Sequence, residues 1–503
     1  MDHRSEIEVR WLDWRDAGEE ILGVRRRVFT DELGWREHRI HHDRDPDGLH
    51  LCAISGGKIV AVISAYVYEP GAPELAVMEL PDTDGPTVEI GKRVGLPTHR
   101  GSLISAELAT SMVRQICEAL RPSRFFLIVR VSEQPHLIER YARRNFVYHT
   151  EVGSGDDAVA VMKVEGEEAL EEFYLKHRDL ARDSSDGSPV FVPSLARFLV
   201  ENGRDDLLAV ERLAVENHYL ELLAIQTEAP RLTAQGRLIL AEQRPRLAST
   251  PFPPAPASLL DIGTGPGEYL AAIAKEEPLA GYRVQGVEPA PQLLVRARSN
   301  FPEYDFRQGT AYTTGEPDSS HDVVTAHFLF VHLRSLDLAL LEMRRILRRG
   351  GLLYVVDVND AGFSAPEVIQ RVVKAYDRNY VGDRLVMNDL PDRAEEFGFQ
   401  LVRRFATTLG NTGDAQPIFD PDRIRLGHAD AWNLLSFVRS QSGIEQSFKE
   451  AQDHYFSTEC EISIPLETQV YQLSPTQKEG PGRGRRPPCR SGGAVGEDLG
   501  QGV

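Results

Sequence analysis

The sequence predicts an α/β protein in which a mixed α+β domain precedes a domain built on a doubly wound parallel sheet. Two separate alternations of strand-like and helix-like runs predict it, one over residues 1–165 and one from Ser258 to about Thr408. Between them Ser249–Ala257 reads STPFPPAPA, whose four prolines fit neither a helix nor a central strand. We therefore expect two cores, for which 503 residues provide enough chain.

The first alternation contains four strand-like runs, LHLCAIS, KIVAVISAYVYE, FFLIVRVS and DAVAVMKV. Helical periodicity appears near Ala17–Phe29 and near Ile104–Leu120. Residues 166–250 are mostly helical in period, as in LLAVERLAVENHYLELLAI. We expect a domain over residues 1–165, followed by a helical linker or lid over 166–250.

The second alternation has strand-like runs at SLLDI, YRVQGVE, HDVVTAH and GLLYVVDV, separated by helix-period segments. This pattern is typical of βαβ crossovers and a parallel sheet. A helix at Ala431–Ser440 and a strand at ISIPLETQVYQL complete a domain over 251–473. The Gly-, Pro- and Arg-rich residues 474–503 lack apolar periodicity and are predicted to be disordered.

Composition narrows the range of partners. The formal net charge of −19 disfavours nucleic acid and acidic membranes, which would be repelled. No uncharged apolar run approaches the length of a membrane span, and the start lacks a signal-peptide core. The four scattered cysteines fit no zinc template, so we expect no metal and a reducing, cytoplasmic compartment.

The chemical signal is the glycine turn Gly263-Thr-Gly265-Pro-Gly267, which follows the strand SLLDI. A dinucleotide site needs G-x-G-x-x-G, whereas this turn is G-x-G-x-G and is followed by Glu268. A carboxylate beside a pyrophosphate is repulsive, but beside a cation it is favourable. The turn therefore favours a cationic adenosine ligand such as S-adenosylmethionine (SAM). Glu288 ends the next strand and can accept ribose hydroxyls, in a NAD site as well as in this one.

Five segments follow in a recognisable order: DIGTGPG, Glu288, Gly309-Thr310-Ala311, HDVVTAHFLFVHL and RRILRRGGLLYVVDV. In this order and spacing, residues 258–408 resemble the class I SAM-dependent methyltransferases, which have a Rossmann-like fold. The resemblance implies a turn around the methionine portion of SAM formed by Asp261, Gly263, Gly265 and Gly267. It also implies that Glu288 holds the ribose, and that Thr310 and Ala311 lie beside the adenine.

The same resemblance places His327 and Phe328 against the methyl group and its acceptor. Histidine exchanges protons near neutral pH, so His327 is the candidate general base. An added helical lid would cover the acceptor, with Tyr219, Trp432, Phe437 and Tyr455 as candidate lining residues.

The N-terminal unit carries VFTDELGW followed by Asp43, Asp45 and Asp47. Over residues 20–163 it resembles GNAT acyltransferases, and in particular their acyl-homoserine-lactone-synthase-like branch. The resemblance implies an acyl thioester such as acetyl-CoA held at Arg100 and Gly101. It implies Tyr141 as the acid for the departing thiolate and Glu89 as the base.

Leu103 and Ser105 stand where the GNAT motif has glycines, and their Cβ atoms obstruct close backbone approach. An acyl carrier protein as donor partner, or no donor at all, therefore remains an alternative to CoA. The sequence leaves open whether this half transfers an acyl group.

These observations together predict a SAM-dependent methyltransferase that acts on a small-molecule acceptor in specialised metabolism. Its N-terminal half would be an acyltransferase-like domain. Two alternatives stay open: a nicotinamide-dependent oxidoreductase, and a non-catalytic SAM-binding protein whose GNAT-like half docks a partner. The acceptor, the choice among N-, O- and C-methylation, and the oligomeric state are not determined by the sequence.

Overall fold

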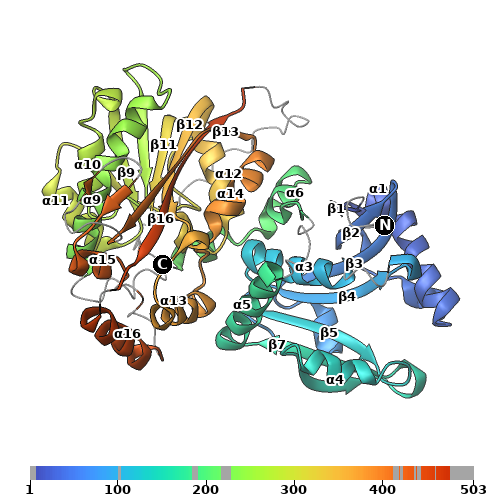
Figure 1. Ribbon diagram of the computed structural model, residues 1–503. Coiled ribbons are helices and arrows are strands. Elements are labelled where there is room, and N and C mark those ends of the chain that lie inside the picture. Colours follow the sequence, from blue (N-terminus) through green and yellow to red (C-terminus); the bar gives the residue numbers. More distant parts are fainter. Residues whose placement is uncertain are drawn as a thin grey trace, which may run out of the picture.

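The computed structural model describes residues 7–99, 104–183, 191–216, 228–411, 418–419, 423–435, 438, 443–458 and 460–475. Two lobes lie side by side, each built around its own sheet (Figure 1). Within this described part, no helix is both long and apolar enough to cross a bilayer. Almost all of the tail predicted to be disordered lies outside the described residues.

The N-terminal lobe has a seven-stranded sheet in the order β1-β2-β3-β4-β5-β7-β6. Its strands are β1 (Ile7–Leu12), β2 (Leu49–Ser55), β3 (Lys58–Tyr68), β4 (Thr87–Gly95), β5 (Arg124–Arg130), β6 (Val147–Val152) and β7 (Val159–Glu165). Its helices of more than one turn are α1 (Trp14–Arg25), which continues as a π-helix over Arg26–Glu32, α2 (Pro73–Val77), α3 (Ile104–Leu120) and α4 (His136–Ala142). The four strands and two helices predicted here are confirmed, α3 with the predicted bounds.

Strands β4 and β5 form the one parallel pair of this sheet among the described residues. They pair only from Thr87 opposite Arg124 to Glu89 opposite Phe126, although both strands continue beyond these positions. Lys92 in β4 has a φ of +50°, within a stretch where the register with β3 shifts. The end of β4 is therefore irregular beside Glu89.

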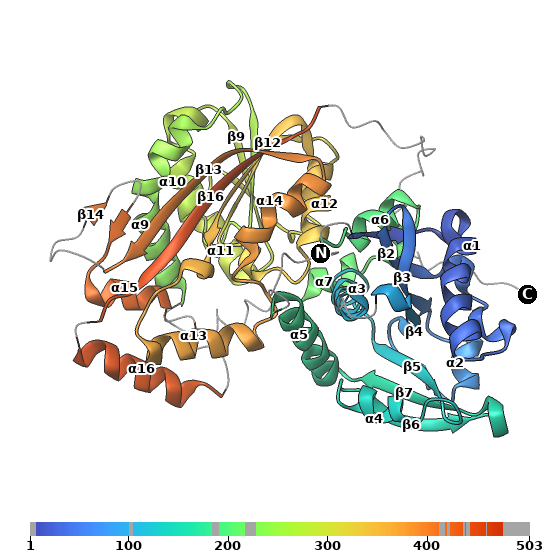
Figure 2. The ribbon, with the colours of Figure 1, turned by 45° about the vertical axis from the view of Figure 1, so that its right-hand side comes forward.

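The described parts of the segment 166–250 are mostly helical, as predicted, and they lie against different sheets (Figure 2). Its helices are α5 (Glu167–Asp183), α6 (Leu195–Glu201), α7 (Val210–Val215) and α9 (Glu228–Ser249). Helix α5 packs against α3 of the N-terminal lobe, and Phe173 and Tyr174 are buried there. Helix α9 packs against the C-terminal lobe beside α10 (Glu268–Ile273).

The C-terminal lobe has a nine-stranded sheet in the order β10-β9-β8-β11-β12-β16-β13-β15-β14. Its strands are β8 (Ser258–Ile262), β9 (Arg283–Glu288), β10 (Asp305–Gln308), β11 (His321–His327), β12 (Leu347–Val358), β13 (Phe399–Gly410), β14 (Ile418–Phe419), β15 (Arg423–Arg425) and β16 (Ser463–Leu473). The other helices are α11 (Pro291–Asn300), α12 (Leu336–Ile346), α13 (Glu367–Asn379), α14 (Val386–Glu396), α15 (His428–Leu435) and α16 (Glu445–Ser457).

The four predicted strands β8, β9, β11 and β12 are parallel, as predicted, and β10, which was not predicted, is parallel to β9. Strand β8 is buried along its whole length. The C-terminal edge of the sheet departs from the predicted parallel arrangement. There β16 returns antiparallel between β12 and β13, so the sheet is mixed. This insertion separates it from the dinucleotide-binding sheet with strand order 3-2-1-4-5-6.

Candidate active site

A cavity of about 230 Å³ opens at the carboxyl ends of β8, β9 and β11. This is the edge at which open parallel sheets bind their ligands. The cavity is lined by the glycine turn, by the loop after β10 and by helix α9. Of the residues predicted for SAM, it contains Asp261, Gly263, Gly265, Glu288, Thr310, Ala311, His327 and Phe328.

The three glycines of the turn all have positive φ, and each has a different neighbourhood. A Cβ on Gly267 would lie 3.0 to 3.2 Å from Phe306, Ala297 and Phe301, so this glycine is required by packing. Gly265 has φ +57° and no atom within 4 Å of a Cβ placed there. Its open side is therefore available for a ligand that approaches the backbone closely.

Glu288 ends β9 inside the cavity wall and is 5% exposed. One carboxylate oxygen accepts from the N–H of Gly265 at 2.9 Å, and the other accepts from Ala290 at 2.9 Å. Burial raises the pKa of Glu288 to about 7, against the opposing effect of these two N–H groups. Each oxygen keeps a lone pair for a ligand hydroxyl.

His327 ends β11 and is held by Asp261 at the end of β8. Its Nδ1 lies 3.1 Å from Asp261 Oδ1, which also accepts from the Thr325 hydroxyl at 2.7 Å. A carboxylate is an acceptor only, so Nδ1 carries the proton and Nε2 keeps its lone pair. The sequence predicted His327 as a base but did not predict that Asp261 orients it.

Polar atoms in the cavity wall support a fit to SAM. Thr264 Oγ1, Tyr269 Oη and His327 Nε2 are buried and have no hydrogen-bond partner within the described residues. Carboxylates of Asp261, Glu268 and Glu288 line the same cavity, which suits a ligand with a sulfonium and an ammonium group. The residues present therefore fit SAM.

The far wall of the cavity was only partly predicted. Helix α9 contributes Arg231, Leu232, Gln235, Gly236 and Ile239, in line with the predicted lid. The loop after β11 adds Leu329, and β13, α15 and β16 add Leu409, Leu434 and Ile464, so apolar side chains line part of this wall beside polar ones.

The aromatic residues proposed for the lid do not line the cavity where they are described. Trp432 and Tyr455 instead stack on each other with ring centroids 5.0 Å apart, as buried core residues. Tyr219 and Phe437 lie outside the described residues. Tyr269, which does line the cavity, was not predicted, although it lies two residues after the glycine turn.

The N-terminal candidates lie in a different neighbourhood. Glu89 is buried, accepts from the Tyr68 hydroxyl at 2.8 Å and lies 3.2 Å from His42 Nε2. Tyr141 packs edge-on against Phe146, with ring centroids 6.1 Å apart. Arg100 and Gly101, predicted to hold the acyl thioester, lie outside the described residues. His42, a partner of Glu89 within its buried surroundings, was not predicted from the sequence.

The part of the chain that forms much of the cavity matches a known protein family. Residues 260–355, which contain the glycine turn, Glu288, His327 and most of β12, match the methyltransferase domain family. This part of the chain resembles a methyltransferase domain. The SAM dependence of that family implies SAM as the cofactor of the domain.

Curated relatives of the methyltransferase domain share about a third of its residues. A demethylmenaquinone methyltransferase of Chlorobaculum parvum is 32% identical over 99 residues, which are 20% of this chain and 40% of the relative. A ubiquinone biosynthesis O-methyltransferase of Azorhizobium caulinodans is 34% identical over 139 residues, 26% of this chain and 48% of the relative. The chain thus spans less than half the length of these relatives.

Among solved structures, a SAM-dependent methyltransferase from Thermotoga maritima is 16% identical with a TM-score of 0.33. The superposition covers the whole of that structure and 51% of this chain.

Proposed function

We propose that the protein is a SAM-dependent methyltransferase that acts on a small-molecule acceptor. The observation that carries this proposal is the single cavity that joins the glycine turn, Glu288 and His327. When bound, SAM supplies an activated methyl group, whose bond to sulfur breaks with the electron pair passing to the sulfur. What the protein adds is positioning, exclusion of water and proton transfer.

The residues divide this work between two ends of the cavity. At one end the backbone of the glycine turn and the Glu288 carboxylate would hold the amino acid and ribose portions of SAM. At the other end His327 Nε2 would take the proton of the acceptor, while Asp261 stabilises the imidazolium that forms. General base catalysis of this kind contributes about 10²–10⁴-fold.

The acceptor end supports a small molecule with an apolar body. Leu232, Leu329 and Leu434 lie on its wall, and the chain carries a net charge of −19. A polyanionic acceptor would be repelled by this charge. The relatives named above for demethylmenaquinone and ubiquinone biosynthesis are consistent with a small acceptor of this kind.

The N-terminal lobe would serve as a GNAT-like acyltransferase that acts on a related intermediate. Two observations support this role. Strands β4 and β5 pair over only three positions, and the last of them, Glu89, is buried beside His42. Glu89 would be the base and Tyr141 the acid in that reaction, with an acyl thioester or an acyl carrier protein as donor. Two group-transfer folds in one chain suggest a role in specialised metabolism, an inference from fold rather than from site.

The test is a labelled-methyl assay on the full chain. The protein is incubated with SAM labelled in its methyl group and a library of small hydroxyl, amine and activated-carbon acceptors. We expect label in an extracted acceptor, and loss of that label in the His327→Ala variant, which should still bind SAM. If the protein binds SAM but no acceptor is ever labelled, the non-catalytic alternative is favoured.

A further inference from the structure

The proposed acceptor end of the cavity contains two polar groups that have no hydrogen-bond partner among the described residues. Tyr269 Oη and His327 Nε2 are both buried and lack a hydrogen-bond partner within the described residues, and both side chains line the cavity. Their rings meet edge to face, with centroids 4.2 Å apart. A buried polar group without a hydrogen-bond partner costs free energy, so two such groups in one cavity indicate a binding site for a ligand.

The two groups have opposite hydrogen-bonding character. Because Asp261 holds His327 Nδ1 as a donor, Nε2 can only accept a proton. Burial raises the pKa of Tyr269 well above its ordinary value, so its hydroxyl stays protonated and donates. One acceptor and one donor thus lie on adjoining rings.

We propose that Tyr269 and His327 together select an oxygen nucleophile, an acidic hydroxyl on an apolar body, as the methyl acceptor. This rests on the proposed methyltransferase function and adds the substrate class. A hydroxyl donates its proton to His327 Nε2, accepts from Tyr269 through one lone pair, and keeps the second lone pair to attack the methyl carbon. A neutral amine has one lone pair, which cannot both accept from Tyr269 and attack.

The step balances within these groups. The O–H bond breaks and its proton passes to His327 Nε2, while a C–O bond forms to the methyl carbon and the methyl–sulfur bond breaks. The imidazolium then loses the proton to solvent. The products are a methyl ether and S-adenosylhomocysteine.

The experiment uses the full chain loaded with S-adenosylhomocysteine and two isosteric pairs of probes, 1-naphthol with 1-naphthylamine and 4-butylphenol with 4-butylaniline. We expect at least one hydroxyl probe to bind more tightly than its amine. Tyr269→Phe should weaken hydroxyl binding about three- to tenfold, as loss of one hydrogen bond implies, and leave amine binding unchanged. The matched control is Tyr354→Phe, because the Tyr354 hydroxyl is already bound to Gln243 and lies outside the cavity lining.

Labelled SAM provides a second readout, in which the methyl ether of the hydroxyl probe should form and N-methyl product should not. The proposal is overturned if no hydroxyl probe binds more tightly than its amine, or if an amine or a ring carbon is methylated in preference to the hydroxyl. It is also overturned if Tyr269→Phe weakens the binding of S-adenosylhomocysteine rather than that of the hydroxyl probe. Failure to bind S-adenosylhomocysteine at all would overturn the proposed function rather than the acceptor class.

Discussion

At the scale of single residues, the account depends on Glu288, on the contact of Asp261 with His327, and on Gly265. Glu288 is buried with a raised pKa, Asp261 holds His327, and Gly265 leaves the backbone open. Each makes a prediction that can be measured separately.

The affinity for SAM should rise with pH because of Glu288. Its folded pKa of about 7 lies above the ordinary value of 4.5, mainly through burial and with a smaller contribution from the Asp261 charge. Because the pKa of Glu288 is raised by folding, its protonated form contributes stability to the ligand-free protein at low pH. This contribution is lost as the pH rises through about 7. Ribose hydroxyls donate best to the ionised carboxylate, so SAM binding should tighten roughly tenfold between pH 6 and 8. Calorimetric titration at pH 6, 7 and 8 measures this, and Glu288→Gln should remove the slope.

Asp261→Asn should reduce methyl transfer more than it reduces SAM binding. The amide does not hold His327 with Nε2 as the proton acceptor, so turnover should fall by about 10²–10⁴-fold. Thr325→Val is the control, because it removes the other hydrogen bond to Asp261 and leaves the His327 contact in place. Equal losses in both variants would show that Asp261 acts only through local stability.

Gly265→Ala should weaken the binding of SAM more than an alanine that replaces an equally strained glycine elsewhere. Both Gly265 and Gly350 have positive φ with open space around a Cβ, so alanine costs about 1–2 kcal/mol of stability at either position. Only Gly265 lines the cavity. A comparable loss of SAM affinity in Gly350→Ala would contradict the role assigned to the turn.

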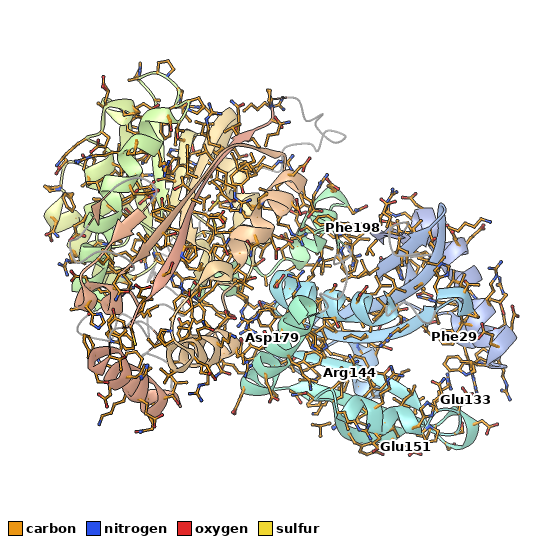
Figure 3. The ribbon with its side chains drawn as sticks, in the orientation of Figure 1. Phe29, Glu133, Arg144, Glu151, Asp179 and Phe198 are labelled. Atoms are coloured by element: carbon orange, nitrogen blue, oxygen red, sulfur yellow. The ribbon has the colours of Figure 1, made fainter. Side chains whose placement is uncertain are left out.

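At the scale of elements, helix α5 joins the two lobes through Arg178. This buried side chain donates to the backbone carbonyls of Asp377 and Gly382 at 2.7 and 2.9 Å, and to that of Tyr380, all at or beyond the end of α13. Figure 3 labels its neighbour Asp179 where α5 approaches the larger lobe. The guanidinium thus satisfies carbonyls that a helix end leaves without partners.

Arg178→Met should therefore destabilise the protein by about 2–3 kcal/mol, the value of charged hydrogen bonds to buried carbonyls. Urea unfolding followed by circular dichroism measures it. Arg143→Met is the matched control, since its ion pair with Glu139 is 75% exposed on both sides and should contribute little. No difference between the two variants would mean that Arg178 does not stabilise the contact.

Periodicity and turn chemistry were enough to predict most elements. The run SLLDI, apolar but for Ser258 and Asp261, became the buried strand β8, and the apolar face of Ile104–Leu120 became α3. The position of β16 between β12 and β13 could not be predicted, because it depends on pairing between distant segments rather than on local pattern. The same holds for the contact of Asp261 with His327, which joins residues 66 positions apart on neighbouring strands.

At the scale of the whole molecule, the first lobe ends later than its sequence pattern indicates. Residues 167–183 form α5, and Phe173 packs against Phe125 of β5 at a centroid distance of 5.3 Å. A second link lies at the cavity wall, where Arg334 pairs with Glu171 of α5 and, at 3.3 Å, with Glu216. The lobes therefore share buried contacts.

A fragment of residues 1–165 should consequently be unstable, because it lacks the aromatic residues of α5 that complete its core. A fragment of residues 1–216 retains α5, α6 and α7 and should fold. Circular dichroism and limited proteolysis of the two fragments compare them. A cooperative unfolding transition in the shorter fragment would contradict this assignment of the core.

The central claim is that the cavity at β8, β9 and β11 receives a cationic adenosyl ligand and not a dinucleotide. Isothermal titration of the full chain with SAM and, separately, with NADH tests it most directly. We predict saturable binding of SAM with one site per chain, weakened in Gly265→Ala, and no saturable binding of NADH. Saturable binding of NADH in preference to SAM would contradict the account.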